Sequence, residues 1–162
     1  MRADRFERLY EEHAQSLLGF LVYRTGDRTL AEDLLADTFE RALRARGRFD
    51  RRRGSEKTWL YSIALNRLRD HARREGAERR ALERSGAPAD AFGELPSTEA
   101  VEARDAVVRA LGVLSPEERE AIALRFGADM TVPEIAKLTR QRLSTVEGRV
   151  YRALRKLRAK LV

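Results

Sequence analysis

The stretch LTRQRLSTVEGRVYRALRKLR, residues 138–158, combines arginines with small polar residues in a pattern that suits nucleic-acid recognition. From Lys137 to Lys160 the chain carries nine basic residues and a single acidic one, Glu147. Arginine pairs with phosphates and can bind the edge of guanine through two hydrogen bonds, and small side chains let a helix backbone approach the bases. These residue types indicate a surface that binds DNA rather than one that performs catalysis.

A helix over this stretch separates apolar from polar positions. At 100° per residue one face is aliphatic, with Val146, Val150, Ala153, Leu154, Leu157 and Leu161. The opposite face is basic and polar. Such a helix also fits two other settings, the solvated face of a bundle and a membrane surface, but the absence of Trp and Phe on the apolar face disfavours the membrane.

The residues before this helix favour a helix-turn-helix. The segment TVPEIAKL predicts a short helix, since Thr131 and Glu134 have the spacing of a capping box. A short capped helix, a tight turn and a basic helix form the layout in which the second helix enters the major groove. The predicted DNA-contacting residues of this motif are Arg140, Arg142, Ser144, Thr145, Gly148, Arg149 and Arg152.

Composition excludes several classes of protein. The 162 residues carry a net charge of +7, no cysteine and only two histidines, so we expect an anionic partner, no disulfides and no metal site. No apolar run approaches the ~20 residues that span a bilayer, and the N-terminal residues do not resemble a signal peptide, so we expect a cytoplasmic protein without membrane insertion. We find no catalytic triad and no phosphate-binding glycine loop, and we expect neither enzymatic activity nor a cofactor.

The charge divides the chain into two basic modules joined by an acidic segment. Residues 85–103 contain four acidic residues and no basic one, and they are rich in Gly, Pro, Ser and Ala. We therefore expect an all-α protein of two small helical domains, 1–80 and 104–162, joined by a flexible linker, 81–103.

Helical periodicity and capping signals predict the elements of both modules. In the first module we expect helices over about 6–25, 29–46 and 58–74, the second of them starting at a capping box of Thr29 and Glu32. In the second module a helix with Val101, Val107, Val108, Leu111 and Leu114 facing inward precedes one that starts at Ser115, with Glu118 closing its capping box, and ends at Gly127.

The chain resembles the extracytoplasmic-function (ECF) group of bacterial RNA polymerase sigma factors. LAEDLLADTFERALR (30–44) resembles the AEDLxQETFxRA helix of the family, and WLYSIALNRLRDHARR (59–74) resembles its WLxxIAxNxxxDxxRR helix. The C-terminal run resembles the family's EIAxxLGxxxGTVKSRLxRA motif. The likeness covers about 6–80 and 104–158, and three motifs in the same order with a linker between are specific.

The resemblance implies a role for each surface. It implies that the first module, sigma region 2, binds core RNA polymerase through Asp33, Asp37, Glu40 and Arg41. It also implies capture of a flipped base of the −10 element by the 49–57 loop and the helix after it, with Arg51, Arg52, Arg53, Asn66, Arg67 and Arg69 as candidates. Trp59 is expected in the core and Asp70 in a pair with an arginine. The second module, region 4, would bind the −35 element, the linker would thread polymerase channels, and an anti-sigma factor is an expected partner.

Two departures from the family pattern stand out. Glu56 replaces an apolar or aromatic residue in the loop of the first module, which predicts an altered base pocket. In the second module Thr139 replaces leucine, Arg140 the turn glycine, Ser144 a second glycine and Glu147 a lysine. An arginine in a left-handed turn costs roughly 1 kcal/mol relative to glycine, so the turn changes shape, the DNA target differs, or this surface contacts a protein.

Three functions follow in order of preference. The first is a sigma factor that directs promoter-specific initiation. The second is a stand-alone helix-turn-helix regulator, which the first module and the lack of a dimerisation helix disfavour. The third is a sigma-like interaction protein with a divergent DNA-reading surface, favoured only by the altered turn.

Overall fold

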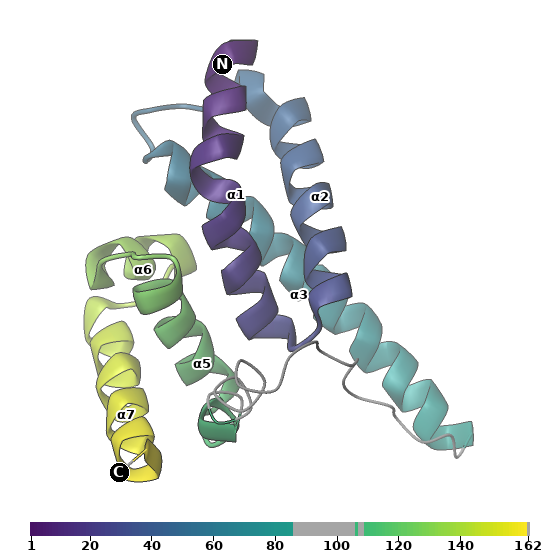
Figure 1. Ribbon diagram of the computed structural model, residues 1–162, viewed down its shortest axis with the longest axis vertical. Helices are drawn as coiled ribbons and strands as arrows, with labels where there is room; N and C mark the ends of the chain where they lie inside the picture. The colour runs from purple at the N-terminus through teal and green to yellow at the C-terminus, as the bar shows by residue number, and fades with distance from the viewer. Residues whose placement is uncertain (86–105, 107–108, 162) are drawn as a thin grey trace.

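The computed structural model describes residues 1–85, 106 and 109–161, and every regular element in those ranges is a helix (Figure 1). The first module comprises α1 (Ala3–Thr25), α2 (Arg28–Ala45), the 3-10 turn η1 (Arg46–Arg48) and α3 (Glu56–Ser85). The second comprises α5 (Pro116–Ile122), the π-helical turn η2 (Ala123–Gly127), α6 (Val132–Thr139) and α7 (Leu143–Leu161). The predicted all-α fold is confirmed for these ranges. Most of the predicted linker, together with Val101, Val107 and Val108, lies outside the described residues.

The helix boundaries follow local capping signals, with one correction. Gly26 ends α1 in a left-handed conformation (φ 69°), directly after the predicted end of this helix at residue 25. The predicted cap of α2 at Thr29 is wrong, because Asp27 caps this helix and its side chain accepts a hydrogen bond from the Leu30 amide at 3.2 Å. A carboxylate immediately before the first turn satisfies the free amides as well as a hydroxyl does. The capping boxes at Ser115 and Thr131 are both confirmed.

The third helix is longer than its apolar periodicity predicts. Periodicity predicts this helix over 58–74, whereas it runs from Glu56 to Ser85, so that the first five residues of the predicted linker are helical. The extension is rich in Ala, Glu and Arg, which have high helix propensity without forming an apolar stripe. Apolar periodicity therefore does not predict the part of α3 that follows residue 74.

The two modules pack against each other. α1 contacts η2 and α3 contacts α6, and Figure 1 shows the second module alongside α1. Leu124 and Met130 of the second module are fully buried in the same cluster as Leu17 and Phe20 of α1. Polar contacts add to this interface, because Arg24 pairs with Glu120 at 3.7 Å and Lys57 Nζ donates to the Asp129 carbonyl at 3.2 Å. The unbound chain is therefore a closed pair of modules.

Candidate nucleic-acid interface

The turn of the helix-turn-helix keeps a left-handed residue although it lacks glycine. Arg140 ends α6 with φ 55° and ψ 44°, and the Gln141 amide donates to the Ala136 carbonyl at 2.9 Å. This six-to-one hydrogen bond is the Schellman pattern that a glycine usually completes. The turn therefore keeps its ordinary shape, and the predicted change of shape is wrong: the arginine is held in a conformation that its Cβ disfavours.

Gln141 ties the turn to the recognition helix α7. Its side-chain Oε1 accepts hydrogen bonds from Thr139 Oγ1 at 3.2 Å and from Arg149 Nη1 at 2.6 Å. The Ile135 carbonyl lies 2.7 Å from Thr139 Oγ1 and shares the single hydroxyl hydrogen with Gln141. Arg149 thus has one donor engaged within the motif, and Gln141, which sequence reasoning did not select, positions the start of α7.

The predicted DNA-contacting residues lie along the outer face of α7 and its preceding turn. Val146 and Ala153 are buried on the inner face, as the helical wheel predicts, whereas Leu161 at the end of the helix is exposed. Arg152 folds back over Gly148, since a Cβ built on this glycine would lie 3.0 Å from Arg152 Nη1. Arg140, Arg142, Ser144 and Arg152 are exposed, and Thr145, Gly148 and Arg149 are half-buried. The motif therefore presents most of these side chains to one side.

An ion pair between an exposed lysine and a buried glutamate joins α7 to α5. Lys156 Nζ donates to Glu118 Oε1 at 2.7 Å, and Glu118 is 5% exposed. The hydrogen bond from Lys156 lowers the pKa of Glu118, and hydrogen bonds from Ser115 reinforce this against the desolvation that burial imposes. The same carboxylate closes the capping box of α5. The two residues lie 38 positions apart in the sequence, so no local sequence pattern predicts this pair.

The loop that begins at Phe49 presents three consecutive arginines to solvent. Arg51, Arg52 and Arg53 are all exposed. Asp50 holds the turn beneath them, because its side chain accepts from the Arg52 amide at 3.0 Å and its carbonyl accepts from the Arg53 amide at 3.1 Å. Local hydrogen bonds therefore shape the loop, and its guanidinium groups remain outside.

The outer stripe of α3 continues from this loop. The rotation of 100° per residue places Asn66, Arg69 and Arg73 within about 60° of one another, and all three are exposed. Trp59 lies on the same side of α3, about two turns before Asn66. It packs against Phe49, with ring centroids 5.3 Å apart. Trp59 also packs against the core, as expected. An aromatic pair flanked by cations suits a surface for unstacked bases.

Arg67 is placed differently from the other −10 candidates. Its side chain is 13% exposed and forms ion pairs with Asp37 of α2 and with Asp70. Asp70 also pairs with Arg73 at 3.0 Å, as expected for a structural aspartate. Arg67 therefore links α3 to α2, and it lies on the buried side of the exposed stripe of α3.

The predicted polymerase-binding face of α2 is covered by intrahelical ion pairs. Asp37 pairs with Arg41 at 3.6 Å and Glu40 pairs with Arg44 at 2.7 Å. Asp33, Glu40 and Arg41 are exposed, and Asp37 is half-buried by its contact with Arg67. Asp33, Asp37 and Glu40 share one side of the helix, so they are available together to a partner.

Glu56, the unusual residue of the loop, has a specific partner. It begins α3 and forms an ion pair with Arg5 of α1. The Arg5 guanidinium also lies 6.0 Å from the centre of the Phe49 ring. An ion pair thus replaces the apolar contact that the family pattern predicts, and it lies beside the Phe49–Trp59 aromatic pair.

A three-helix module with a basic, aromatic loop and a second module with a helix-turn-helix define a two-domain DNA-binding protein. The chain matches Sigma-70 region 2 over residues 9–78 and Sigma-70 region 4 over residues 104–157. It belongs to the ECF group of RNA polymerase sigma factors, as its relatives also indicate.

The similarity to individual relatives extends over almost the whole chain. The chain is 34% identical to the RNA polymerase sigma factor CarQ of Myxococcus xanthus over 96% of its own length and 88% of that protein. It is 33% identical to the ECF sigma factor BldN of Streptomyces coelicolor over 96% of its length, but it spans only 60% of BldN. Among solved structures, CnrH in complex with the cytosolic domain of CnrY is 28% identical, with a TM-score of 0.74 over 99% of this chain and 89% of CnrH.

Proposed function

We propose that this sigma factor binds core RNA polymerase and directs it to promoters by recognising −10 and −35 elements. The observation that carries the proposal is the pair of basic surfaces, the 49–55 loop with the α3 stripe in the first module and α7 in the second. The first combines cations with an aromatic pair, which suits unpaired bases, and the second has the geometry of a major-groove reader. The polymerase would perform the chemistry, and this chain would supply specificity.

Binding both elements requires the modules to separate. The −10 and −35 elements are about 25 base pairs apart, or roughly 85 Å at 3.4 Å per base pair. Each module has a radius of gyration of roughly 12 Å for its length, so modules in direct contact do not span that distance. The packing of α1 on η2 and of α3 on α6 therefore belongs to the unbound protein.

The docking face for polymerase is the outer side of α2. Asp33, Asp37, Glu40 and Arg41 provide three carboxylates and one guanidinium on a rigid helix, an arrangement suited to a partner surface of mixed charge. The intrahelical pairs of this face are exposed and weak, so exchanging them for intermolecular pairs costs little.

An anti-sigma factor is a further proposed partner. The similar protein CnrH was solved in complex with the cytosolic domain of CnrY, so a protein of this fold binds a protein partner. Among the described residues no helix is long and apolar enough to cross a membrane, and we place this sigma factor in the cytoplasm, where polymerase is found.

Transcription in vitro with purified core polymerase tests the proposal. Promoters would first be selected from a random DNA library by the reconstituted holoenzyme. We expect transcripts that depend on the added sigma factor, and we expect R142A/R152A to lose ten-fold or more through the −35 element. DNA binding without polymerase association would support a stand-alone regulator, and polymerase association without transcription would support an interaction protein; either result would overturn the proposal.

A further inference from the structure

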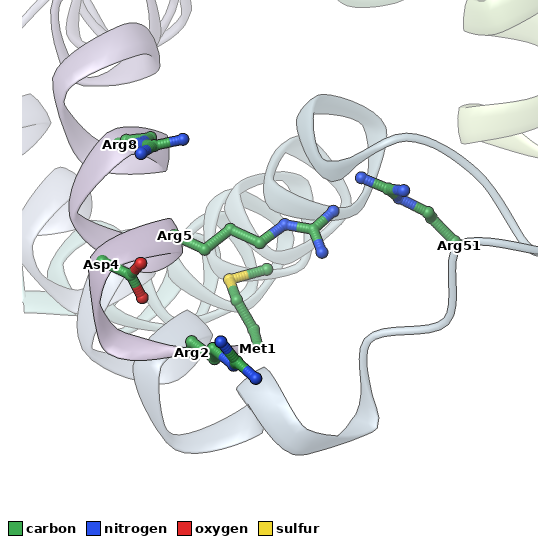
Figure 2. Close-up of a pocket in the computed structure, with 6 residues that line it drawn as sticks. All are labelled: Met1, Arg2, Asp4, Arg5, Arg8 and Arg51. Carbon is green, nitrogen blue, oxygen red and sulfur yellow. The ribbon is translucent and has the colours of Figure 1, made fainter.

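A pocket of about 490 Å³ lies at the N-terminal end of the first module, beside the basic loop (Figure 2). Four of its six lining residues are arginines. The lining residues are Met1, Arg2, Asp4, Arg5, Arg8 and Arg51. A pocket with this lining selects for an anion.

The arginines come from two elements that are distant in sequence. Arg2, Arg5 and Arg8 follow one another at intervals of three residues at the start of α1, where such neighbours share a side of the helix. Arg51 comes from the loop. Figure 2 shows the guanidinium groups of Arg5 and Arg51 directed toward each other across the pocket. The fold, rather than local sequence, brings these charges together.

This arrangement is unfavourable for the protein alone. The N-terminus of a helix carries a partial positive charge and favours acidic side chains, yet Arg2 occupies the N-cap of α1 without a capping side-chain hydrogen bond. Arg5 is paired with Glu56, but among the described residues no ion pair involves Arg2, Arg8 or Arg51. Asp4 is the only acidic residue in the lining. Clustered like charges repel, and a bound anion would remove that cost.

We propose that this pocket binds backbone phosphates of the single-stranded promoter DNA that continues from the −10 loop. The inference rests on the proposed function. Arg51 belongs both to the loop and to the pocket, so a strand held at the loop passes directly into the pocket. The volume lies within the range of small-ligand sites. Arg2, Arg5 and Arg8 precede the Sigma-70 region 2 match, which begins at residue 9, so this contact is additional to that region.

Strand binding by the full-length protein tests the inference. Fluorescence anisotropy would follow a labelled single strand that carries the selected −10 element and its flanks, over a series of salt concentrations. For R8Q we expect weaker binding and a slope of log K against log salt that is smaller by about 0.7, the value for one lost phosphate contact on a single strand. R2Q/R8Q should lose about twice as much. R28Q is the matched control, because it removes one exposed arginine at the opposite end of the α1–α2 hairpin.

The outcomes separate this inference from the proposed function. If R8Q and R28Q have equal slopes while the wild-type protein binds the strand and supports transcription, only the pocket proposal fails. If the wild-type protein binds no promoter strand but supports transcription, only the pocket proposal fails; if it does neither, both fail. Titration with inorganic tripolyphosphate gives a third arm: binding that R8Q abolishes, with an unchanged DNA slope, would identify a site for a small phosphate ligand and overturn the DNA assignment.

Discussion

Asp37 of α2 and Arg67 of α3 form an ion pair between Oδ2 and Nε, and Arg67 extends it to Asp70 at 3.4 Å. Sequence resemblance assigned Asp37 to the polymerase and Arg67 to promoter DNA. In the folded chain they are one contact, and the proposed polymerase face and DNA face lie on either side of it. A substitution at either residue therefore alters both surfaces.

Replacing Arg67 with methionine should destabilise the first module. R67M leaves Asp37 and Asp70 without their shared cation in a site where Arg67 is 13% exposed, and we expect a loss of about 1–3 kcal/mol in the free energy of unfolding. R44M removes the exposed pair of Arg44 with Glu40 and should cost less than about 0.5 kcal/mol. Urea denaturation measures both, and equal losses would show that the Asp37–Arg67 pair contributes no more than an exposed one.

Glycine at position 140 should stabilise the second module. Arg140 has φ 55°, where an L-residue is disfavoured, so R140G should raise the free energy of unfolding by about 1 kcal/mol. For a chain of this length such a gain corresponds to about 2–4 °C in Tm, which calorimetry resolves. R140A is the control, because alanine retains the Cβ and should leave Tm nearly unchanged. A rise of the same size in R140A would assign the effect to loss of the arginine charge.

The elements of the fold were predictable because their signals are local. Capping boxes at Ser115 and Thr131, the glycine that ends α1 and the apolar stripe of α7 each depend on residues a few positions apart. Asp27 and Thr29 are both capping residues and lie close together, so local spacing does not show which of them caps α2. In the structure Asp27 is the cap. The sequence of the α3 extension has high helix propensity but no apolar stripe, so apolar periodicity does not predict it.

The site was predictable only in part, for a related reason. Exposed arginines in the loop and in α7 follow from sequence position. Contacts such as Lys156–Glu118, Arg5–Glu56 and Asp37–Arg67 join residues 30 to 51 positions apart and have no periodic signal. Each arises because helix packing brings one particular face against another. The pairs that position the site therefore could not be predicted from the sequence, even where one or both partners were named as site residues.

The pair of Lys156 and Glu118 predicts a dependence of stability on pH. The pKa of Glu118 is lowered in the folded state from its usual value near 4.5, so the unfolded state binds more protons as pH falls. The stabilisation is complete above the usual value and is lost as pH falls through the lowered one. E118Q should therefore be less stable than wild type at pH 7, by about 1–3 kcal/mol, with the difference shrinking below pH 4.

Urea midpoints at several pH values measure that difference. Comparing each variant with wild type at the same pH cancels the titration of the other carboxylates. E134Q is the control, because Glu134 also closes a capping box but pairs with no lysine in the part of the chain that the structure describes. A gap between E118Q and wild type that stays constant from pH 7 to 3 would contradict the assigned role of Lys156.

The ion pair between Arg24 and Glu120 predicts control over opening of the two modules. Their charged atoms lie 3.7 Å apart across the interface, with side chains only 22% and 20% exposed. E120R places two guanidinium groups at this contact, and R24E places two carboxylates there, so like-charge repulsion should shift either variant toward separated modules. Promoter binding needs separated modules. Both variants should therefore bind promoter DNA in holoenzyme with a smaller free-energy cost for separating the modules.

Distance measurement by fluorescence transfer follows the opening directly. The chain has no cysteine, so A36C and A159C label one exposed position in each module. Transfer efficiency should fall in E120R and in R24E and return toward the wild-type value in R24E/E120R, which restores the pair with reversed polarity. Net charge changes in opposite directions in the two single variants, so a fall in both is not a general charge effect. If R24E/E120R remains as open as the single variants, apolar packing around Leu124 and Met130, and not the ion pair, governs closure.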